Sequence, residues 1–382
     1  MDNLVSDYGT PLYVTDLDIV EDRYNNLENS INIDVKYACK SNFDPLVLNR
    51  LQDNDAEFVA GSSYEAMIAY ENGVDAGRLQ VTAVSPSSES ITQLINLSKE
   101  SENFTVVIND YDTCRRLCRN GFSGRCLIRL KASKDLMSSD KYSNGSYMKF
   151  GMTEEEIRDS IRLIQDSGAD MLGFHSHLGG TIKNSDIQGF RDHCANIINR
   201  SKKYVDLSDI DVINFGGGFG VPEKQGEEEI NLTELNRSIS SVLESEDSIR
   251  YVVEPGRYIS APSTVLLTEV RTVREDDNGR FIGVDAGMSQ FPRTTMFDVY
   301  HEIRNLSDYA EQSKQTVAGP TCSGADVFCH EREFGKCHKG DILALENVGA
   351  YGFVMAGNFH GYPYPTIVDA DGNTSPLSGG LE

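Results

Sequence analysis

Val35-Lys36-Tyr37-Ala38-Cys39-Lys40-Ser41-Asn42 is the stretch of sequence that decides how the rest of the chain is interpreted. Val35, Tyr37 and Cys39 alternate with other residues, and polar residues and Pro45 follow. This pattern predicts a short buried strand that ends on a lysine. The carboxyl end of a first strand is where (β/α)₈-barrel enzymes keep their reacting groups. An isolated lysine at a strand end is usually only a solvated charge. Whether Lys40 has a chemical role must therefore be judged from the residues at the ends of later strands.

Apolar segments and helical patterns alternate along the next 220 or so residues. The eight candidate strands are Ile33–Ala38, Ala56–Ala60, Leu79–Val84, Phe104–Ile108, Cys126–Leu130, Met171–His177, Val212–Phe215 and Tyr251–Val253. The helical stretches between them include Leu46–Gln52, Ser63–Asn72, Ile91–Ser98, Glu154–Gln165 and Gln188–Tyr204. Eight strand-helix repeats predict an α/β fold, a parallel (β/α)₈ TIM-like barrel of about 250 residues.

The alternation of strand and helix patterns ends after Arg257. Thr264–Arg274 and Arg280–Val284 flank Glu275-Asp276-Asp277-Asn278-Gly279, which is a strong hairpin signal. Asp341–Ala344 and Thr366–Val368 have the composition of further strands. We therefore expect the barrel over residues 13–257, and a mostly antiparallel β domain, a barrel or a sandwich, from residues 1–12 and 258–382.

Composition excludes several classes of protein. The net charge of −24 argues against nucleic acid or an anionic membrane as a partner. No apolar run approaches the roughly 20 residues of a membrane span, and Met1-Asp2-Asn3-Leu4 does not begin a signal peptide. The eight cysteines are scattered without CxxC spacing, which favours cytosolic thiols. We expect a cytoplasmic protein, and no metal site at His175 and His177, because no cysteine or carboxylate cluster accompanies them.

Three later strands also end in residues that are unusual for a strand end. The stretches that follow them are Phe174-His175-Ser176-His177-Leu178-Gly179-Gly180, Asn214-Phe215-Gly216-Gly217-Gly218-Phe219-Gly220 and Glu254-Pro255-Gly256-Arg257. Three consecutive glycines let backbone N–H groups approach an anion. Barrels commonly bind phosphate after strands seven and eight, and an arginine there adds a forked donor. The alternative for the glycines is a flexible loop, but the arginine at the next strand end favours a phosphate site.

A phosphate site, a lysine, an acid and an imidazole together describe a site for pyridoxal 5'-phosphate. Lys40 would hold the cofactor aldehyde as a Schiff base. Glu254 would keep the pyridine nitrogen protonated, so that the ring acts as an electron sink, and His177 would stack on the ring face. Glu254 could instead be a surface carboxylate, but a glutamate that ends a buried strand needs a partner.

The chain resembles the fold-type III pyridoxal-phosphate decarboxylases, the family of diaminopimelate, ornithine and arginine decarboxylases. The matching stretches, in family order, are Tyr37-Ala38-Cys39-Lys40-Ser41-Asn42, His177-Leu178-Gly179, Gly216-Gly217-Gly218, Glu254-Pro255-Gly256-Arg257, Gly319-Pro320-Thr321-Cys322 and Gly349-Ala350-Tyr351-Gly352. Lys149-Phe150-Gly151 is typical of the diaminopimelate branch.

The resemblance implies a role for individual residues at the cofactor. It makes Lys40 the Schiff-base lysine, Glu254 the pyridine-nitrogen partner and His177 the stacking residue. It assigns the cofactor phosphate to Gly217, Gly218, Arg257 and Tyr351. Arg129, at the end of the fifth strand, would lie near the phenolic oxygen of the cofactor.

The resemblance also implies a homodimer whose active site is shared between subunits. Cys322 would be contributed across the interface and would protonate the decarboxylated carbon; the alternative is a buried structural cysteine. Arg293 would bind a substrate carboxylate, with Tyr351 nearby. The substrate would be an amino acid, and neither nucleic acid nor a membrane would be a partner.

The substrate end of the chain departs from the family pattern. Ser323 stands where the family has an acidic residue that binds the distal amine of the substrate, and a hydroxyl offers no full charge to an ammonium group. Asp326 would have to compensate. Phe297 replaces a tyrosine that is usual in the diaminopimelate branch, Val59 stands near the position of an expected aspartate, and Asn358–Pro365 replaces a segment that is richer in arginine.

These observations predict a pyridoxal-phosphate-dependent decarboxylase, a carboxy-lyase of amino-acid metabolism. Meso-diaminopimelate, giving L-lysine and CO2 in lysine biosynthesis, is the first candidate substrate. The alternative is another or a modified diamino acid in a secondary pathway such as siderophore, antibiotic or polyamine biosynthesis. Glu254 argues against an amino-acid racemase, whose pyridine nitrogen pairs with an arginine. Lys40 and Cys322 argue against a non-catalytic homologue that regulates a partner.

Overall fold

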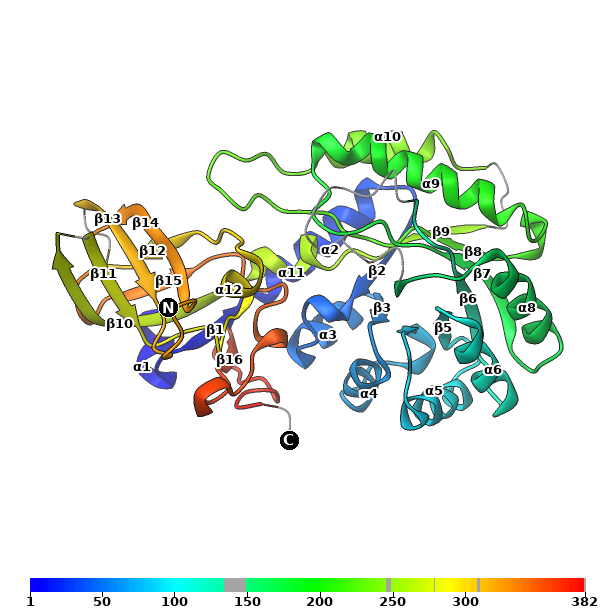
Figure 1. The fold of residues 1–382 in the computed structure, drawn as a ribbon, viewed down its shortest axis with the longest axis horizontal. Coiled ribbons are helices and arrows are strands. Elements are labelled where there is room, and N and C mark those ends of the chain that lie inside the picture. Colours follow the sequence, from blue (N-terminus) through cyan, green and yellow to red (C-terminus); the bar gives the residue numbers. More distant parts are fainter. Residues whose placement is uncertain (134–148, 245–248, 278, 308–309, 381–382) are drawn as a thin grey trace.

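The chain folds around two separate sheets. The computed structural model describes residues 1–133, 149–244, 249–277, 279–307 and 310–380. One sheet is a closed barrel of eight parallel strands, and the other has eight strands, counted over these described residues. The barrel lies on the right of Figure 1 and the second sheet on the left, where the N-terminus also lies.

The barrel consists of the eight predicted strands. They are β2 (Asp34–Ala38), β3 (Glu57–Ala60), β4 (Leu79–Ala83), β5 (Thr105–Ile108), β6 (Arg125–Arg129), β7 (Asp170–His175), β8 (Val212–Asn214) and β9 (Arg250–Val253). Each strand pairs in parallel with its neighbours, and β2 closes the barrel on β9. The prediction of a parallel eight-stranded barrel is confirmed, with strand ends within two residues of those expected.

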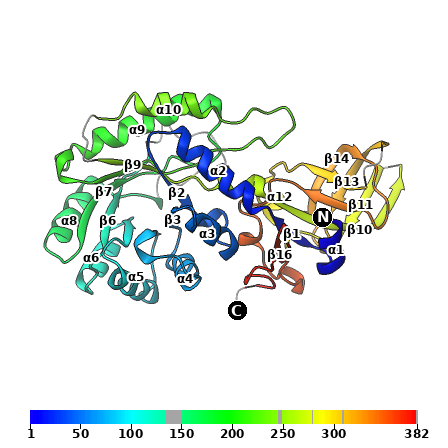
Figure 2. The ribbon, with the colours of Figure 1, turned by 180° about the vertical axis from the view of Figure 1, so that it is seen from behind.

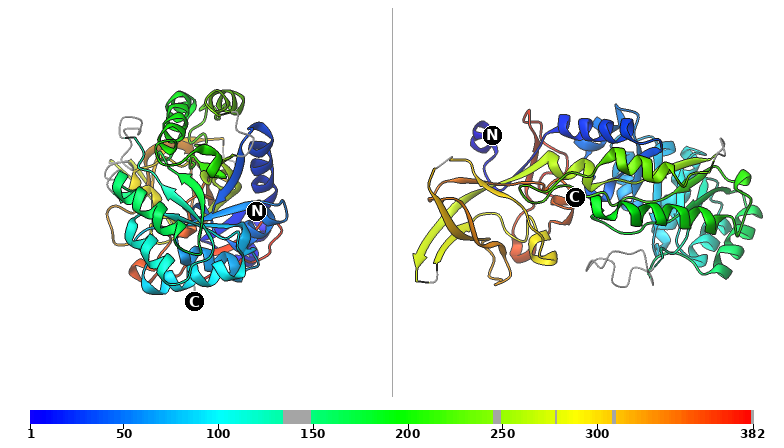
Figure 3. Two further views of the ribbon diagram at one scale, coloured as in Figure 1. Left: turned by 90° about the vertical axis from the view of Figure 1, so that its right-hand side faces the viewer. Right: turned by 90° about the horizontal axis from the view of Figure 1, so that it is seen from above.

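Helices cover the outside of the barrel, as Figure 2 and the end-on view in Figure 3 show. They are α2 (Leu17–Ser30), α3 (Pro45–Gln52), α4 (Ser63–Glu71), α5 (Ser88–Glu100), α6 (Tyr111–Arg119), α8 (Glu154–Gln165), α9 (Ile187–Ser201), α10 (Leu232–Ser240) and the short α11 (Arg257–Ser260). Several begin at a side chain that caps the free N–H groups of the first turn. Thr153 and Glu156 form a complete capping box at α8. No described helix is long and apolar enough to span a membrane.

Both faces of the barrel strands are buried. Val107, Leu127, Leu172, Val212 and Val252 form one apolar cluster, and alternate positions on the same strands pack in the larger cluster that includes the helices. Strands buried on both faces have little reason to carry polar residues. Polar side chains on these strands and at their carboxyl ends therefore need partners, and these partners make up the site described below.

The second sheet is mostly antiparallel, as predicted. Its strands are β1 (Leu12–Thr15), β10 (Thr264–Asp276), β11 (Gly279–Val284), β12 (Ile303–Asn305), β13 (Gln312–Ala318), β14 (Val327–Gly335), β15 (Ile342–Leu345) and β16 (Thr366–Asp369). The hairpin of β10 and β11 is antiparallel, whereas β1 with β16 and β11 with β13 are parallel. Helix α1 (Asp2–Tyr8) precedes β1, and α12 (Arg293–Phe297) follows β11. The predicted domain boundary at residue 13 falls within β1, which pairs with β10 and β16.

Candidate active site

A cavity of about 490 Å³ lies where the carboxyl ends of the barrel strands face the second sheet region. Eight of the predicted site residues line it, namely Lys40, Arg129, His177, Gly218, Glu254, Arg257, Arg293 and Tyr351. The barrel supplies the first six, and the region of the second sheet supplies Arg293 and Tyr351. The structure therefore brings together in one cavity residues that are up to 311 positions apart in the sequence.

Lys40 lies in the 3₁₀ turn η1 (Cys39–Ser41) directly after β2. The hydroxyl of Ser41 donates to the carbonyl of Ala38 at 2.9 Å, and the N–H of Tyr351 donates to the carbonyl of Ser41 at 2.8 Å. These bonds fix the backbone on both sides of an exposed lysine side chain. Glu65, which the sequence did not indicate, contacts the N–H of Gly61 beside this lysine. Burial raises the pKa of Glu65, an effect that the charge of Lys40 partly offsets.

Three side chains from three barrel strands hold the carboxylate of Glu254. Gln80 Nε2 and Asn214 Nδ2 donate to Oε1 at 2.5 and 2.8 Å, and His175 Nε2 lies 3.3 Å from Oε2. Burial acts to raise the pKa of Glu254, but the contacts with His175 and the charge of Lys40 hold it well below its usual range. The carboxylate is therefore an anion at the floor of the cavity. Sequence reasoning missed Gln80 and the roles of Asn214 and His175.

His177 is a neutral imidazole with a defined tautomer. Its Nδ1 accepts the backbone N–H of Gly217 at 3.1 Å, so the ring proton must be on Nε2. Burial lowers the pKa of His177 well below its ordinary value, and the charges of Lys40 and Arg129 act in the same direction. An uncharged ring that lines the cavity is suited to lie against an aromatic ligand.

The glycine run is required by close packing as well as by conformation. A Cβ on Gly217 would lie 1.9 Å from the carbonyl oxygen of Glu254, and one on Gly218, whose φ is +115°, would lie 2.1 Å from that of Gly179. Gly179 and Gly180 line the cavity, and a Cβ on either would meet no protein atom within 4 Å. The backbone is therefore open to a close approach by a ligand there.

Two arginines add positive charge to the cofactor end of the cavity. Arg257 begins α11, and its guanidinium carbon lies 5.2 Å from the ring centre of Tyr351. Arg129 is buried, with its guanidinium 4.2 Å from the ring centre of Phe150. Burial lowers the pKa of Arg129 to about 10, with Glu254 acting in the opposite direction, so the group remains a cation at neutral pH.

Arg293 lines the same cavity from the start of α12, and only 4% of it is exposed. Its Nε donates to Nε2 of His301 at 3.2 Å, and its Nη2 lies 3.9 Å from Oε1 of Glu223. The apolar side chains of Phe297 and Met355 line the same cavity. The cavity lining therefore includes a buried cation as well as apolar side chains.

Of the other four predicted site residues, Gly217 belongs to the glycine run described above, and Cys322, Ser323 and Asp326 lie outside this cavity. Cys322 is exposed, lines a separate surface depression with Tyr362, and donates its backbone N–H to Nδ1 of His360 at 3.4 Å. Asp326 is 2% exposed, and its carboxylate accepts the N–H groups of Met288 and Thr321 at 2.7 and 3.0 Å. Asp326 thus fixes the loop that carries Cys322 and Ser323. The predicted contacts of these three residues with the substrate remain predictions.

The cofactor end fits pyridoxal phosphate in charge and in shape. Lysine and arginine side chains line the same cavity as an open glycine backbone, and both suit a phosphate dianion. The buried anion of Glu254 faces the same space as the neutral ring of His177 and the exposed amine of Lys40. A parallel barrel with these groups at its strand ends defines a pyridoxal-phosphate enzyme.

Comparison with known proteins agrees with this class and narrows it. The family described as "Pyridoxal-dependent decarboxylase, pyridoxal binding domain" matches residues 17–261. The chain belongs to the pyridoxal-dependent decarboxylases.

The similar proteins include diaminopimelate decarboxylases. That of Methanothermobacter thermautotrophicus is 28% identical over 400 residues, covering 96% of this chain and 87% of the relative. The crystal structure of the Helicobacter pylori diaminopimelate decarboxylase in complex with L-lysine is 26% identical, with a TM-score of 0.87 over 96% of this chain and 93% of that one. The lysine/ornithine decarboxylase of Vibrio vulnificus shares the fold at 20% identity and a TM-score of 0.80.

Proposed function

We propose that this protein removes the α-carboxylate from meso-diaminopimelate to give L-lysine and CO2. The observation that carries the proposal is Arg293, a buried cation in the same cavity as Lys40 and Glu254. Meso-diaminopimelate has two amino-acid ends. One end would react at the cofactor while Arg293 binds the carboxylate of the other. The names of the similar decarboxylases support the same substrate.

The residues of this chain would divide the work as follows. The bound cofactor supplies a conjugated ring that accepts the electron pair released when CO2 leaves. Lys40 would supply the amine that holds the aldehyde of the cofactor. Glu254 would favour a proton at the ring nitrogen, because its lowered pKa keeps the carboxylate ionised. His177 packs on the ring, and Gly217, Gly218, Arg257 and Tyr351 would hold the phosphate, with Arg129 beside the ring oxygen.

A homodimer would complete the site. Cys322 is exposed in the single chain and lies outside the cavity, as expected if it serves the active site of a second copy. There it would return a proton to the carbon that has lost CO2. Mixing inactive Lys40→Ala and Cys322→Ala proteins tests this, because a hybrid dimer would regain one intact site. No recovery after proven subunit exchange would contradict a shared site. The dimer and the cytoplasmic location are both proposals.

A second candidate substrate is another, or a modified, diamino acid. Ser323 in place of an acidic residue, together with Phe297 and Met355 on the cavity wall, favours a distal group with less positive charge than a free amine.

The deciding experiment is CO2 release by the purified protein with pyridoxal phosphate. The substrates are meso-diaminopimelate, L-ornithine, L-lysine, L-arginine, L-2,4-diaminobutyrate and an acylated diamino acid. Fast turnover of meso-diaminopimelate alone supports the proposal. Turnover of another substrate with none of meso-diaminopimelate would overturn it in favour of the second candidate.

A further inference from the structure

His301 is the side chain that holds Arg293, and no role was assigned to it from the sequence. It lies between α12 and β12 and is 5% exposed. Its ring packs edge-to-face on Phe291, with 4.8 Å between ring centres, and its own carbonyl accepts a hydrogen bond from Nη1 of Arg332. Both the ring and the backbone of His301 are therefore fixed by neighbours in the second sheet region.

The hydrogen bonds of His301 determine its tautomer. Nδ1 lies 2.9 Å from the backbone carbonyl of Glu346, which can only accept, so Nδ1 must carry the proton. Nε2 lies 3.2 Å from Nε of Arg293, which can only donate, so Nε2 must be bare. Burial lowers the pKa of His301 to about 3, and the charges of Arg293 and Arg257 act in the same direction. The ring is thus a neutral acceptor.

A neutral acceptor suits an arginine that must bind an anion. A buried carboxylate in the place of His301 would form an ion pair with Arg293 and cancel the charge that the substrate carboxylate needs. An imidazole accepts the Nε–H and sets the plane of the guanidinium, and it leaves the positive charge in place.

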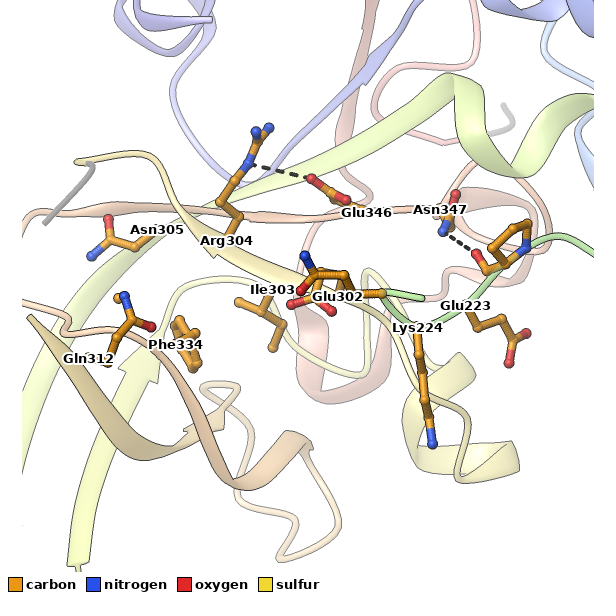
Figure 4. Close-up of a pocket in the computed structure, with 13 residues that line it drawn as sticks. Glu223, Lys224, Glu302, Ile303, Arg304, Asn305, Gln312, Phe334, Glu346 and Asn347 are labelled. Atoms are coloured by element: carbon orange, nitrogen blue, oxygen red, sulfur yellow. Dashed lines mark hydrogen bonds and ion pairs between the residues drawn. The ribbon is translucent and has the colours of Figure 1, made fainter. Parts of the chain in front are cut away.

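Two glutamates lie next to this pair, and neither takes the Nε–H of Arg293. The neighbouring pocket of about 510 Å³ is lined by Glu223 and Glu346, which contact Arg293 and His301. As Figure 4 shows, the carboxylate of Glu346 pairs with Arg304, at an Nε–O distance of 3.4 Å. Only the backbone carbonyl of Glu346 bonds to His301. The partly exposed Glu223 forms a long ion pair with Arg293, with 3.9 Å between Oε1 and Nη2, and leaves the Nε–H to His301.

We infer that His301 is a positioning residue for substrate selection, which orients the guanidinium of Arg293 toward the distal carboxylate of the substrate through the Nε–H···Nε2 hydrogen bond. The inference rests on the proposed function, because it assumes that Arg293 binds that carboxylate. It predicts that His301 contributes to the recognition of one chemical group and leaves the reaction at the cofactor unchanged.

The test compares two ligands that differ by this carboxylate. L-lysine and cadaverine are titrated into the protein loaded with pyridoxal phosphate, and the absorbance change of the bound cofactor gives each Kd. Wild-type protein should bind L-lysine at least about tenfold more tightly than cadaverine, as expected for a hydrogen bond between charged groups. In His301→Asn, which keeps a donor for Glu346 and does not reach Arg293, L-lysine should bind about tenfold more weakly, with cadaverine within about twofold.

His301→Gln is the matched control, because its side-chain oxygen reaches the position of Nε2 and should keep L-lysine binding within about threefold of wild type. Arg293→Gln removes the charge that binds the carboxylate, so L-lysine and cadaverine should have similar Kd values in this variant. It therefore shows the complete loss of discrimination. Wild-type protein that does not distinguish the ligands would refute the proposed use of Arg293. Wild-type discrimination that persists unchanged in His301→Asn would overturn the role of His301.

The tautomer of His301 can be tested in the wild-type protein alone. In protein labelled with ¹⁵N-histidine, the His301 ring should show a protonated Nδ1 and a bare Nε2 at all pH values at which the fold is intact. A proton on Nε2 would overturn the inference independently of the substrate, because Arg293 would then have no acceptor on the ring.

Discussion

Gln80→Leu is the substitution that tests most sharply how the barrel prepares Glu254. Gln80 is fully buried, and its Nε2 donates to Oε1 of Glu254 at 2.5 Å. Leucine has nearly the same volume and cannot donate. A hydrogen bond to a charged group contributes about 1.5–3 kcal/mol net. Because Asn214 still donates to the same oxygen at 2.8 Å, we expect a loss of about 2 kcal/mol from the free energy of unfolding at pH 7.

The loss should depend on pH in a defined direction. The pKa of Glu254 in the folded protein lies below its unfolded value, so the stability that its ionised form contributes is present above about pH 4.3. That contribution disappears as the pH falls through the folded pKa. The difference in unfolding free energy between wild type and Gln80→Leu should be constant between pH 6 and 8, and it should shrink only as the pH falls toward the folded pKa of Glu254, well below the usual range of a glutamate. Urea titrations of the cofactor-free proteins measure it.

Activity should fall as well. If the same 2 kcal/mol is lost from the arrangement that keeps the ring nitrogen protonated, kcat falls about 30-fold. Gln315→Leu is the control, because Gln315 is equally buried and its bonds within the described part of the chain stay in the second sheet region, to Gly335 and Cys337 among others. That control should lose stability and keep its kcat in the loaded enzyme. A Gln80→Leu protein with unchanged kcat and stability, or a Gln315→Leu protein with the same loss of kcat, would refute the reasoning.

Three further predictions concern other parts of the molecule. Lys40→Ala should lose the absorbance band of the bound cofactor, whereas Lys149→Ala, in the same cavity, should keep it; wild-type protein that never acquires the band contradicts the assignment of Lys40. Burial raises the pKa of Asp44 to about 6, above its unfolded value of about 3.9, so stability is lost as the pH rises through this range. The free energy of unfolding of Asp44→Asn, relative to that of wild type, should therefore increase by about 2 kcal/mol from pH 4.5 to pH 8, as urea titrations would measure. A difference between the two proteins that does not change with pH would exclude this cause. Cys322→Ser should lower kcat at least about tenfold. In the wild-type protein, alkylation of Cys322 should slow as the protein concentration rises into the range where dimers form. An alkylation rate that is independent of protein concentration would argue that the thiol stays outside the interface.

The barrel could be predicted because its signal is local. Each strand is a short apolar run between turn residues, and the position of Lys40, His177 and Glu254 at strand ends follows from the parallel arrangement. The strands β13 and β14 were not predicted. Their register shifts between Gln315 and Val317 and again before Ala318, which interrupts the regular alternation that a strand pattern requires. β14 is also the last strand in the order of the second sheet, and its exposed positions carry polar or charged residues.

The residues around Glu254 could not be found as a group from the sequence. Gln80 lies 174 positions from Glu254, and nothing near either residue indicates the other. A usable signal was nevertheless present. A glutamine inside the buried strand Leu79–Ala83 must satisfy both its donor and its acceptor, because an unpaired buried amide is costly. The same argument applies to Asn214, whose side chain donates to Glu254 and accepts the N–H of Gly216.

Two positions in the cavity, Glu254 and Arg293, solve one electrostatic problem in the same way. Each holds a buried charge that must stay available to a ligand, an anion at Glu254 and a cation at Arg293. An oppositely charged partner would fix either group but would also cancel its field. The hydrogen bonds described above come from neutral partners, the amides of Gln80 and Asn214 for Glu254 and the imidazole of His301 for Arg293, while Glu223 adds only a long ion pair at 3.9 Å. These partners orient the charges and satisfy their hydrogen bonds, and the ligand completes the pairing. Selectivity would then depend on partners that do not touch the ligand, because they decide the direction in which each charge points.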